Sequence, residues 1–462
     1  NYCLSSYSST SMDTNFEKGN KKVINAWTFY DWANSVYPLV ITTAIFPIFY
    51  EGYVDEKVIF FGSEWISTAL ITVLSAAYFL LLVLTLPFLT GIADNAGNKK
   101  VFMRFFCYLG SFSCILLAFF NNKNLEISLL IYVIAGIGFW SSLVFYNAFL
   151  PEIAHEKDHD RLSAKGFSMG YLGSVILLLI CLALIFTSPE ESRSIYTRLC
   201  FVLTGLWWFG FSHVTFKQLP NGNKINLTNK ATYKQGFNEI VKVWREVKNT
   251  VRLKRFIYSF FVYSMAVQTI MLVAVYFGTK EINWGDGSDA KIGLIISVLL
   301  IQLIAIPGAI ILSKISEKKG NLFALKLVLF MWVILCFCAG YHPMEYYNFI
   351  IGNEMSPNYI VSEPFDFYCI AGFVGLVMGG IQSLSRSTFS KFIPVNTKDT
   401  SSYFSFYDIS EKLGIVIGML AYGFIEQVTG SARNSIVALV LFFAVGLLLM
   451  FLVPKEEKLK NT

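Results

Sequence analysis

Charged side chains are scarce in this chain of 462 residues: Asp, Glu, Lys and Arg make up 15% of it, whereas soluble domains contain about 25%. Hydrophobic residues reach 55%, and the mean hydropathy is +0.55. So little charge cannot cover the surfaces of the several soluble domains that this length would otherwise suggest. The composition therefore predicts a polytopic integral membrane protein.

Motifs for metal binding, ATP binding and secretion are also missing. The eight cysteines lie mostly in apolar runs without the spacing of metal ligands, so we interpret them as small apolar residues and expect no resident metal or cofactor. No G-x-x-x-x-G-K-[ST] loop occurs, which argues against ATP-driven transport. Residues 1–22 contain no apolar core, so we expect no cleavable signal peptide. Met12 is the first methionine, and we assign no role to residues 1–11.

Long apolar runs are abundant instead. Each run covers about 30 Å as a helix that rises about 1.5 Å per residue, which is enough to cross a bilayer. The sequence therefore predicts an all-α membrane protein with twelve transmembrane helices. The predicted spans, numbered 1 to 12 in chain order, are 27–49, 65–90, 101–120, 125–150, 165–187, 198–217, 255–278, 290–313, 322–341, 366–390, 404–425 and 432–453.

The basic residues are distributed asymmetrically around these spans. All but seven of the 37 Lys and Arg belong to the N-terminal segment, the loops after even-numbered spans, the span ends or the C-terminal tail. By the positive-inside rule, both termini are cytoplasmic and the protein lies in the cell membrane, in the manner of a bacterial inner-membrane protein. The same asymmetry accounts for the net charge of +6, so no nucleic-acid partner is expected. The seven exceptions are Lys57, Lys123, Arg193, Arg198, Lys280, Lys291 and Arg433.

A long polar connection divides the spans into two groups of six. We expect a cytoplasmic tail (1–26), a six-helix bundle (27–217), a cytoplasmic linker (218–254), a second bundle (255–453) and a short tail (454–462). Within the linker, YKQGFNEIVKVWREVKNTV predicts an amphipathic helix that either lies on the membrane surface or packs against the cytoplasmic ends of the bundles. Its apolar face would hold Phe237, Ile240, Val241, Trp244, Val247 and Val251, opposite Lys242, Arg245 and Lys248.

The two halves share a sequence pattern. Gly91-x-x-Asp94-x-x-Gly97-Asn98, between spans 2 and 3, reappears between spans 8 and 9 as Lys314-x-x-Glu317-x-x-Gly320-Asn321. This repeat supports a duplication of six spans. Two parallel halves of this kind form the pseudo-symmetric architecture of major facilitator transporters, which hold the substrate near the midplane between the halves.

The connection between spans 2 and 3 closely resembles the G-x-x-x-D-x-x-G-[RK]-[RK] signature of the major facilitator superfamily (MFS). Gly91, Asp94, Gly97, Lys99 and Lys100 supply it. More narrowly, FYDWANSVYPLVITTAIFP, FYNAFLPEIA, RLSAKGFSMGYLG, VQTIM and GLVMGGIQSLSRS resemble the Atg22-like family of fungal vacuolar effluxers and their bacterial relatives. This resemblance covers all twelve spans. It implies the MFS fold and, for the fungal members, export of amino acids that include leucine-like and aromatic ones.

The same connection is a candidate gate. Its two glycines permit a tight turn between antiparallel helices, and its lysines hold the loop at the anionic inner surface. The resemblance places Asp94 near the cytoplasmic start of span 11, close to Tyr403, where the partial positive charge of a helix N-terminus stabilises a carboxylate. Asp94 would then latch the two halves together, with Glu317 as its counterpart. The alternative is that this connection is only a turn that helps to orient the two helices in the membrane.

A few ionisable residues lie inside the spans, and each is a functional candidate because an unpaired charge there is costly. Asp408 and Lys412 are four residues apart on span 11, close to Glu411, and can neutralise each other. Asp31, near Asn34 on span 1, has no local partner. We interpret it as a gating or proton-titrating carboxylate that faces Arg386 or Lys165 across the bundle. If the residues of such a pair exchanged partners as the two halves move, a proton would be coupled to transport.

Uncharged polar residues near the midplane are candidates for a central substrate cavity. As a cluster from five spans they fit a cavity that binds a zwitterion or another polar solute, although hydrogen bonding between helices is the alternative for any one of them. Span 4 contains GIGFWSSLVFYNAF and lacks the arginine of many proton-driven members, which leaves facilitated or otherwise coupled efflux open. The candidates are Tyr37, Thr42, Tyr146, Asn147, Gln268, Gln302, Gln382, Ser383 and Ser385.

The stretch HEKDH at 155–159 satisfies the H-E-x-x-H pattern of zinc proteases, but that mechanism needs a helix that presents both histidines to one metal. We expect a charged loop here instead, in which Glu152 and Arg161 form an inner-gate pair. The sequence therefore predicts no enzyme but a monomeric secondary or facilitative transporter of a small polar solute, with amino-acid efflux by alternating access as the main interpretation. A lipid translocator of the same fold and a membrane-embedded zinc hydrolase are the alternatives.

Overall fold

The computed structural model describes the chain with gaps. Eleven helical segments of the described part are long and apolar enough to cross a membrane. A helix also covers the predicted span 404–425, namely α15 (Thr400–Thr429), which carries Asp408, Glu411 and Lys412 in its interior. The prediction of an all-helical membrane protein is therefore confirmed. The described residues are 17–222, 230–284, 287–340, 363–395 and 397–455, so the N-terminal segment in which we expected no signal peptide lies largely outside them.

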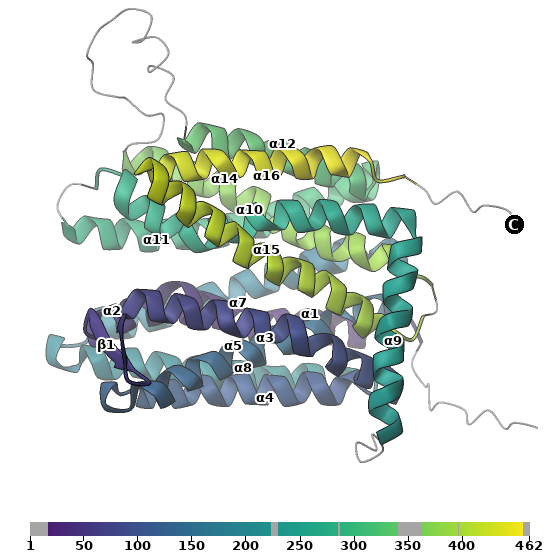
Figure 1. Ribbon diagram of the computed structural model, residues 1–462, viewed down its shortest axis with the longest axis horizontal. Helices are drawn as coiled ribbons and strands as arrows, with labels where there is room; N and C mark the ends of the chain where they lie inside the picture. The colour runs from purple at the N-terminus through teal and green to yellow at the C-terminus, as the bar shows by residue number, and fades with distance from the viewer. Residues whose placement is uncertain (1–16, 223–229, 285–286, 341–362, 396, 456–462) are drawn as a thin grey trace, which may run out of the picture.

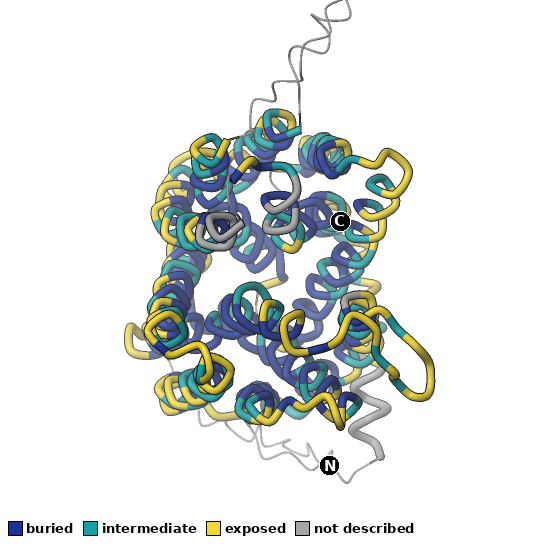
Figure 2. The backbone as a smooth tube through the Cα atoms, turned by 90° about the vertical axis from the view of Figure 1, so that its left-hand side faces the viewer, coloured by how far each residue is buried: buried dark blue, intermediate teal, exposed yellow. Residues whose placement is uncertain are grey.

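The helices form two bundles, which Figure 1 shows one above the other. Seen end-on in Figure 2, the exposed residues gather on the outer rim of the two bundles. The first bundle contains α1 (Lys21–Asn34), η1 (Tyr37–Ala44), α2 (Ile45–Tyr53), α3 (Ser67–Ala96), α4 (Lys99–Leu116), α5 (Leu125–Asn147), α6 (Leu150–Ile153), α7 (His159–Thr187) and α8 (Arg193–Gln218). The second bundle contains α10 (Val251–Glu281), α11 (Gly287–Lys319), α12 (Asn321–Gly340), α14 (Pro364–Phe392), α15 and α16 (Ala432–Phe451).

Short elements join several of these helices. A two-stranded hairpin of β1 (Lys57–Phe60) and β2 (Ser63–Ile66), which the sequence analysis did not predict, precedes α3. Phe61 and Gly62 turn this hairpin, both with positive φ, as a two-residue hairpin turn requires. The remaining short elements are the 3₁₀ turns η2 (Leu117–Phe119), η3 (Asn122–Asn124), η4 (Glu156–Asp158) and η5 (Glu190–Ser192).

The linker helix α9 (Lys230–Asn249) lies across the ends of both bundles, opposite the end with the hairpin (Figure 1). We call this side of the molecule the α9 end. Val243 and Val247 of α9 are buried, and the helix packs against α3 and α15. Of the two predicted placements, the structure supports packing against the bundle ends. Trp244 is nevertheless 55% exposed, and the side chains of Phe237 and Ile240 lie outside the described ones.

The predicted repeat is visible in the backbone. Gly97 follows α3 with φ of 63°, and Gly320 follows α11 with φ of 88°. Both glycines therefore adopt the left-handed conformation that ends a helix and that residues with a Cβ rarely adopt. Gly91, the other glycine expected in the turn, lies inside α3, because that helix continues to Ala96. One glycine per connection is sufficient for the turn.

Candidate functional site

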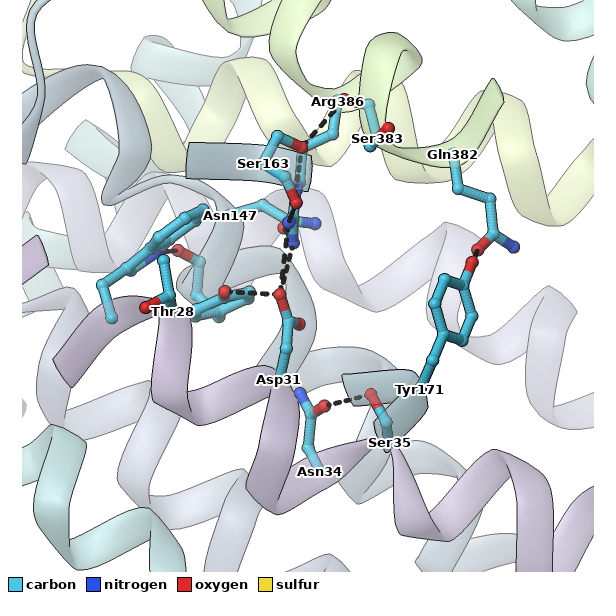
Figure 3. A network of polar contacts seen from close by, with 12 residues as sticks. Thr28, Asp31, Asn34, Ser35, Asn147, Ser163, Tyr171, Gln382, Ser383 and Arg386 are labelled. Carbon is cyan, nitrogen blue, oxygen red and sulfur yellow. Dashed lines mark hydrogen bonds and ion pairs between the residues drawn. The ribbon is translucent and has the colours of Figure 1, made fainter. Parts of the chain in front are cut away.

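Asp31 of the first bundle forms a buried ion pair with Arg386 of the second bundle (Figure 3). Nη1 and Nη2 of Arg386 each lie 3.2 Å from Oδ2 of Asp31. The side chains of Arg386 and Asp31 are only 3% and 6% exposed. Lys165, the alternative partner that we considered, is exposed and donates to Asn25 instead. The pair therefore connects α1 to α14 across the boundary between the bundles.

Hydrogen bonds from the first bundle stabilise this pair. Nε and Nη2 of Arg386 donate to the side-chain and backbone oxygens of Ser163, each at 2.9 Å, and Nη1 lies 3.4 Å from Oδ1 of Asn147. The hydroxyl of Tyr146 donates to Asp31 Oδ2 at 2.8 Å. Such bonds are needed because burying two charges costs several kcal/mol per ion, which the attraction between them offsets only when their other polar atoms are also bonded.

A glycine and two aromatic rings shape the space around the pair. A Cβ atom on Gly166 would stand 2.3 Å from Asp31 Oδ2 and 3.0 Å from Arg386 Nη2. The guanidinium carbon of Arg386 lies 4.2 Å from the ring centre of Phe167 and 5.1 Å from that of Trp27, which adds cation–π attraction. The absence of a side chain at Gly166 is therefore a condition for the pair.

A second charged cluster surrounds Lys412 of α15, whose side chain is fully buried. Its Nζ lies 2.5 Å from Asp408 Oδ1 and 2.9 Å from Glu411 Oε2. Gln268 of α10 donates to the other oxygen of Glu411 at 2.7 Å. Nζ of Lys412 also lies 3.6 Å from the ring centre of Trp140, which belongs to α5 of the first bundle. The predicted contact between Asp408 and Lys412 is present, and Glu411 joins it.

Two more predicted residues form hydrogen bonds near these clusters. The hydroxyl of Tyr171 donates to Oε1 of Gln382 at 2.7 Å and so connects α7 to α14 (Figure 3). The hydroxyls of Tyr263 and Ser385 lie 2.7 Å apart and connect α10 to α14 within the second bundle. Gln382 therefore lies at the boundary between the bundles, whereas the contact of Ser385 is internal to one bundle.

Other predicted cavity residues have a different environment. Tyr37 is 1% exposed and stacks on Phe139 of the same bundle at 4.9 Å. The hydroxyl of Ser383 donates to the carbonyl of Gly379 in its own helix, although its backbone carbonyl accepts a bond from Ser163 across the boundary. Gln302 and Thr42 are half-buried. In the described part of the chain, no hydrogen bond joins these two side chains to either charged cluster.

Asn34 lies one helical turn after Asp31, on the same side of α1 (Figure 3). It is 1% exposed and accepts a hydrogen bond from Ser35 at 3.4 Å. Its side-chain nitrogen is buried and has no hydrogen-bond partner among the described residues. Leaving a buried donor unsatisfied costs about 1–3 kcal/mol. The amide of Asn34 is therefore available to an acceptor atom beside the ion pair.

At the α9 end, Asp94 connects α3 to α15. Its carboxylate accepts hydrogen bonds from the backbone N–H groups of Ser401 at 3.2 Å and Ser402 at 2.6 Å. Both donors belong to the first turn of α15, where a negative charge is stabilised by about 0.3–1 kcal/mol when exposed and by more when partly buried. The predicted contact of Asp94 with the start of span 11 is confirmed. Its role as a gate stays a prediction.

Lys99 and Glu152 extend this contact. Lys99 donates to the carboxylate of Glu152 and to the hydroxyl of Thr400, and Thr400 donates to Glu152 at 2.7 Å. The predicted pair of Glu152 and Arg161 is wrong, because Arg161 pairs with Asp158, three residues before it, at 2.7 Å. Glu152 therefore belongs to the group of residues around Asp94.

Lys100, the last residue of the predicted signature, contacts the start of the linker. Its Nζ donates to the carbonyl of Leu219 at 2.7 Å and to Oδ1 of Asn221 at 2.8 Å. The signature thus contacts two different segments, because Asp94 and Lys99 reach α15 whereas Lys100 holds the chain that leaves α8.

The matching connection of the second half uses another carboxylate. Asp160, at the start of α7 and 1% exposed, accepts hydrogen bonds from Ser316 at 2.8 Å, Asn321 at 2.6 Å and Lys391 at 2.8 Å. Glu317, the predicted counterpart of Asp94, is exposed. Each repeated connection therefore contacts the start of a helix in the opposite bundle. In the first half the carboxylate, Asp94, belongs to the connection, whereas in the second half the carboxylate, Asp160, belongs to the helix that the connection contacts.

The linker helix adds polar contacts at the same end. Lys242 of α9 pairs with Asp399 at 2.6 Å, and Tyr403 of α15 donates to Glu246. The rings of Trp244 and Phe406 lie 5.5 Å apart. The contacts that hold α15 at the α9 end thus come from both the first bundle and the linker.

The HEKDH stretch does not form the helix of a zinc protease. Glu156, Lys157 and Asp158 form a 3₁₀ turn between the two histidines. His155 is exposed, whereas His159 is buried with Nε2 3.2 Å from the carbonyl of Ala154. Within the described residues, no group of three potential metal ligands occurs. The two histidines therefore lack the common helical face that the zinc mechanism requires.

Solved structures with the same arrangement are transporters. The proton:xylose symporter XylE is similar with a TM-score of 0.67 at 11% identity, over 94% of this chain and 96% of that one. The transporter FucP in its outward conformation gives 0.65 at 15% identity, over 94% and 99%. The chain therefore has the fold of these major facilitator proteins, with charged residues buried between its two bundles.

Sequence comparison gives the family. The family model described as "Vacuole effluxer Atg22 like" matches residues 19–462, so the chain belongs to the Atg22-like family, as its motifs indicated. It is 31% identical to the uncharacterized MFS-type transporter YxiO of Bacillus subtilis, over 94% of this chain and 95% of that protein. It is also 24% identical to autophagy-related protein 22-2 of Aspergillus oryzae, over 79% of this chain and 70% of that protein.

Several residues of the site were not predicted. Ser163, Asp160 and Trp140 contact the charged groups, but serines and tryptophans are ordinary in membrane helices, and Asp160 lies among the other charges of the HEKDH loop. Gly166 was not singled out either, because small residues that allow helices to approach are frequent in membrane helices. Only the tertiary arrangement distinguishes these residues from their neighbours.

Proposed function

We propose that this protein exports a small polar solute, an amino acid in the first instance, by alternating access of the space between its two bundles. The buried ion pair of Asp31 and Arg386 carries this proposal. It joins the bundles at a position where neither charge has another ionic partner, among the residues described. Burying a charge pair at such depth costs free energy, and ionisable residues inside membrane segments are by default candidates for function.

The position of the pair suits a gate. Arg386 lies six residues before the end of α14, and Asp31 lies ten residues after the start of α1, which is about 9 Å and 15 Å from the α9 end at 1.5 Å per residue. The contacts of Asp94 and Asp160 lie closer to that end. The structure is then a state closed at the α9 end by successive layers of contacts, all of which must part for the space to open there.

A zwitterion suits the groups beside the pair. Asn34 has an unsatisfied amide donor, and the side chain of Gln382 is half-buried at the bundle boundary. Amides can bind a carboxylate or an ammonium group without a permanent charge of their own. Asp31 also serves as the gating or proton-titrating carboxylate of this proposal. Its protonation would release Arg386 and thereby link a proton to opening.

The predicted orientation and location belong to the same proposal. The α9 end contains the lysines of both repeated connections, namely Lys99, Lys100, Lys318 and Lys319, which supports a cytoplasmic position for this end by the positive-inside rule. Both termini would then be cytoplasmic, and a monomer in the cell membrane would carry out transport.

The test is transport by the purified protein in liposomes. Labelled amino acids are screened by counterflow with and without an imposed proton gradient. Flux of at least one amino acid that disappears in the Asp31→Asn variant supports the proposal. Absence of flux for all amino acids would refute an amino-acid substrate but not the MFS fold. Flux that is unchanged in Asp31→Asn would refute the proposed role of the ion pair in transport.

A further inference from the structure

The charged residues between the bundles do not balance. Asp31 and Arg386 form a neutral pair, whereas Lys412 is shared by two carboxylates, Asp408 and Glu411. When all are ionised, the cluster around Lys412 has a net charge of −1. Within the part of the chain that the structure describes, Glu411 contacts no second cation.

This imbalance lies deep in the protein. Glu411 is eleven residues after Thr400, where α15 begins at the α9 end. At about 1.5 Å per residue this corresponds to about 16 Å along the helix, or about half of a hydrocarbon core that is roughly 30 Å thick. An uncompensated charge at such depth is expensive, and intramembrane carboxylates of this kind mark the paths of substrates and ions.

Glu411 is also the accessible member of the cluster. Its side chain is 15% exposed, compared with 8% for Asp408 and 0% for Lys412. Gln268, which donates to Glu411, is half-buried, as is Trp140 from the opposite bundle. Residues of α15, α10 and, from the opposite bundle, α5 therefore meet around the cluster to which Glu411 belongs.

On this basis, and resting on the proposed transport function, we propose that Glu411 binds the ammonium group of the transported solute. The solute's positive charge supplies the charge that the cluster lacks, and the carbonyl oxygen of Gln268 offers a neutral acceptor next to Glu411. Lys412 stays paired with Asp408 and holds the site in place. The substrate class is thus a solute with a primary ammonium group, and a solute whose amine is blocked is rejected.

Three related probes test this site on the purified full-length protein by isothermal titration calorimetry. L-leucine and L-leucinamide keep the ammonium group, whereas N-acetyl-L-leucine lacks it and keeps the carboxylate. We expect L-leucine and L-leucinamide to bind and N-acetyl-L-leucine to bind at least tenfold more weakly. Absence of binding of L-leucinamide, or equal binding of the acetylated probe, overturns the proposal without any variant.

Variants then assign the effect to Glu411. Glu411→Gln keeps the shape and the contact with Gln268 and should lose at least tenfold in affinity for L-leucinamide, while Glu411→Asp keeps most of it. Glu190→Gln, at a side chain that is 88% exposed, is the matched control and should bind like the unmodified protein. Size-exclusion chromatography confirms that each variant is folded. Unchanged affinity in Glu411→Gln overturns the proposal. This outcome would show that Glu411 does not bind the solute and only binds a proton or stabilises the fold.

The counterflow assay separates this proposal from the proposed function. If amino acids are transported and Glu411→Gln binds as well as the unmodified protein, the ammonium site is refuted and the transport function is supported. If binding depends on the ammonium group and Glu411→Gln abolishes it, but no amino acid is transported, the ammonium site is supported and amino-acid transport is refuted.

Discussion

Asp31 and Arg386 are 355 positions apart in the chain, yet two guanidinium nitrogens of Arg386 lie 3.2 Å from one carboxylate oxygen of Asp31. The pair crosses the boundary between two bundles that must separate in an alternating-access transporter. Its partners Ser163 and Tyr146 lie on the side of the first bundle. A movement of α14 relative to α1 and α7 would break the bonds of Arg386 to Asp31 and Ser163 together, whereas the bond from Tyr146 to Asp31 lies within the first bundle.

Removal of one charge of this pair should destabilise the protein. Asp31→Asn leaves Arg386 buried without a carboxylate, and breaking a buried pair in this way costs about 3–5 kcal/mol. We expect a lower temperature of thermal denaturation in detergent and a loss of flux. The double variant Asp31→Asn, Arg386→Gln removes both charges and should recover most of the thermal stability but not the flux. Recovery of flux in the double variant would show that the pair is structural.

A single methyl group at Gly166 should have nearly the same effect. The Cβ atom of Gly166→Ala would stand 2.3 Å from Asp31 Oδ2, so the carboxylate must move away from Arg386. We expect flux to fall at least tenfold in the counterflow assay. Gly210→Ala is the matched control, because its Cβ atom would meet nothing within 4 Å. Equal flux in the two variants would mean that the ion pair tolerates displacement.

The contact of Asp94 should protect the first turn of α15. Asp94→Ala removes the acceptor of the backbone N–H groups of Ser401 and Ser402, so hydrogen–deuterium exchange of a peptide that covers these residues should become at least several-fold faster. Asp55→Ala, at an exposed position near the opposite end, should leave this peptide unchanged. Exchange that does not respond to Asp94→Ala would show that other contacts hold the turn.

The linker helix should restrain opening at the α9 end. Lys242→Ala removes the ion pair with Asp399, and Glu246→Ala removes the acceptor of Tyr403. We expect the combined variant to keep flux and to increase proteolysis within α9. Lys248→Ala, at an exposed position of the same helix, serves as the control. If the combined variant were cut no faster than the control, α9 would be held by its apolar contacts alone.

Much of the fold was predictable because each span is a long apolar run, and bilayer thickness leaves few alternatives for such runs. The repeated connections were also recognisable, since both turns need a glycine that can adopt positive φ. The short hairpin before α3 was not predicted, because its strands contain only four residues each. The interruption of the first span by the π-helical segment η1 (Tyr37–Ala44) was also missed, although Pro38 lies at its start.

The site was predictable only in part. A carboxylate inside a span, such as Asp31, is conspicuous because of its cost, and Arg386 was one of few possible partners. The pairing of Glu152 with Lys99 was missed because it depends on how distant helices meet, and sequence proximity favoured Arg161. Tyr37 shows the same limit: a tyrosine that faces a cavity and one that stacks on Phe139 occupy similar positions in a sequence.

The central claim, that the bundles enclose a space that opens to either side in turn, is tested most directly by a cysteine at Gln382. In a chain freed of its native cysteines, Gln382→Cys is exposed to a membrane-impermeant thiol reagent, in right-side-out and in inverted vesicles. The account predicts labelling from both sides, slowed by a transported solute. A cysteine that reacts from neither side, or from one side only under all conditions, would contradict alternating access.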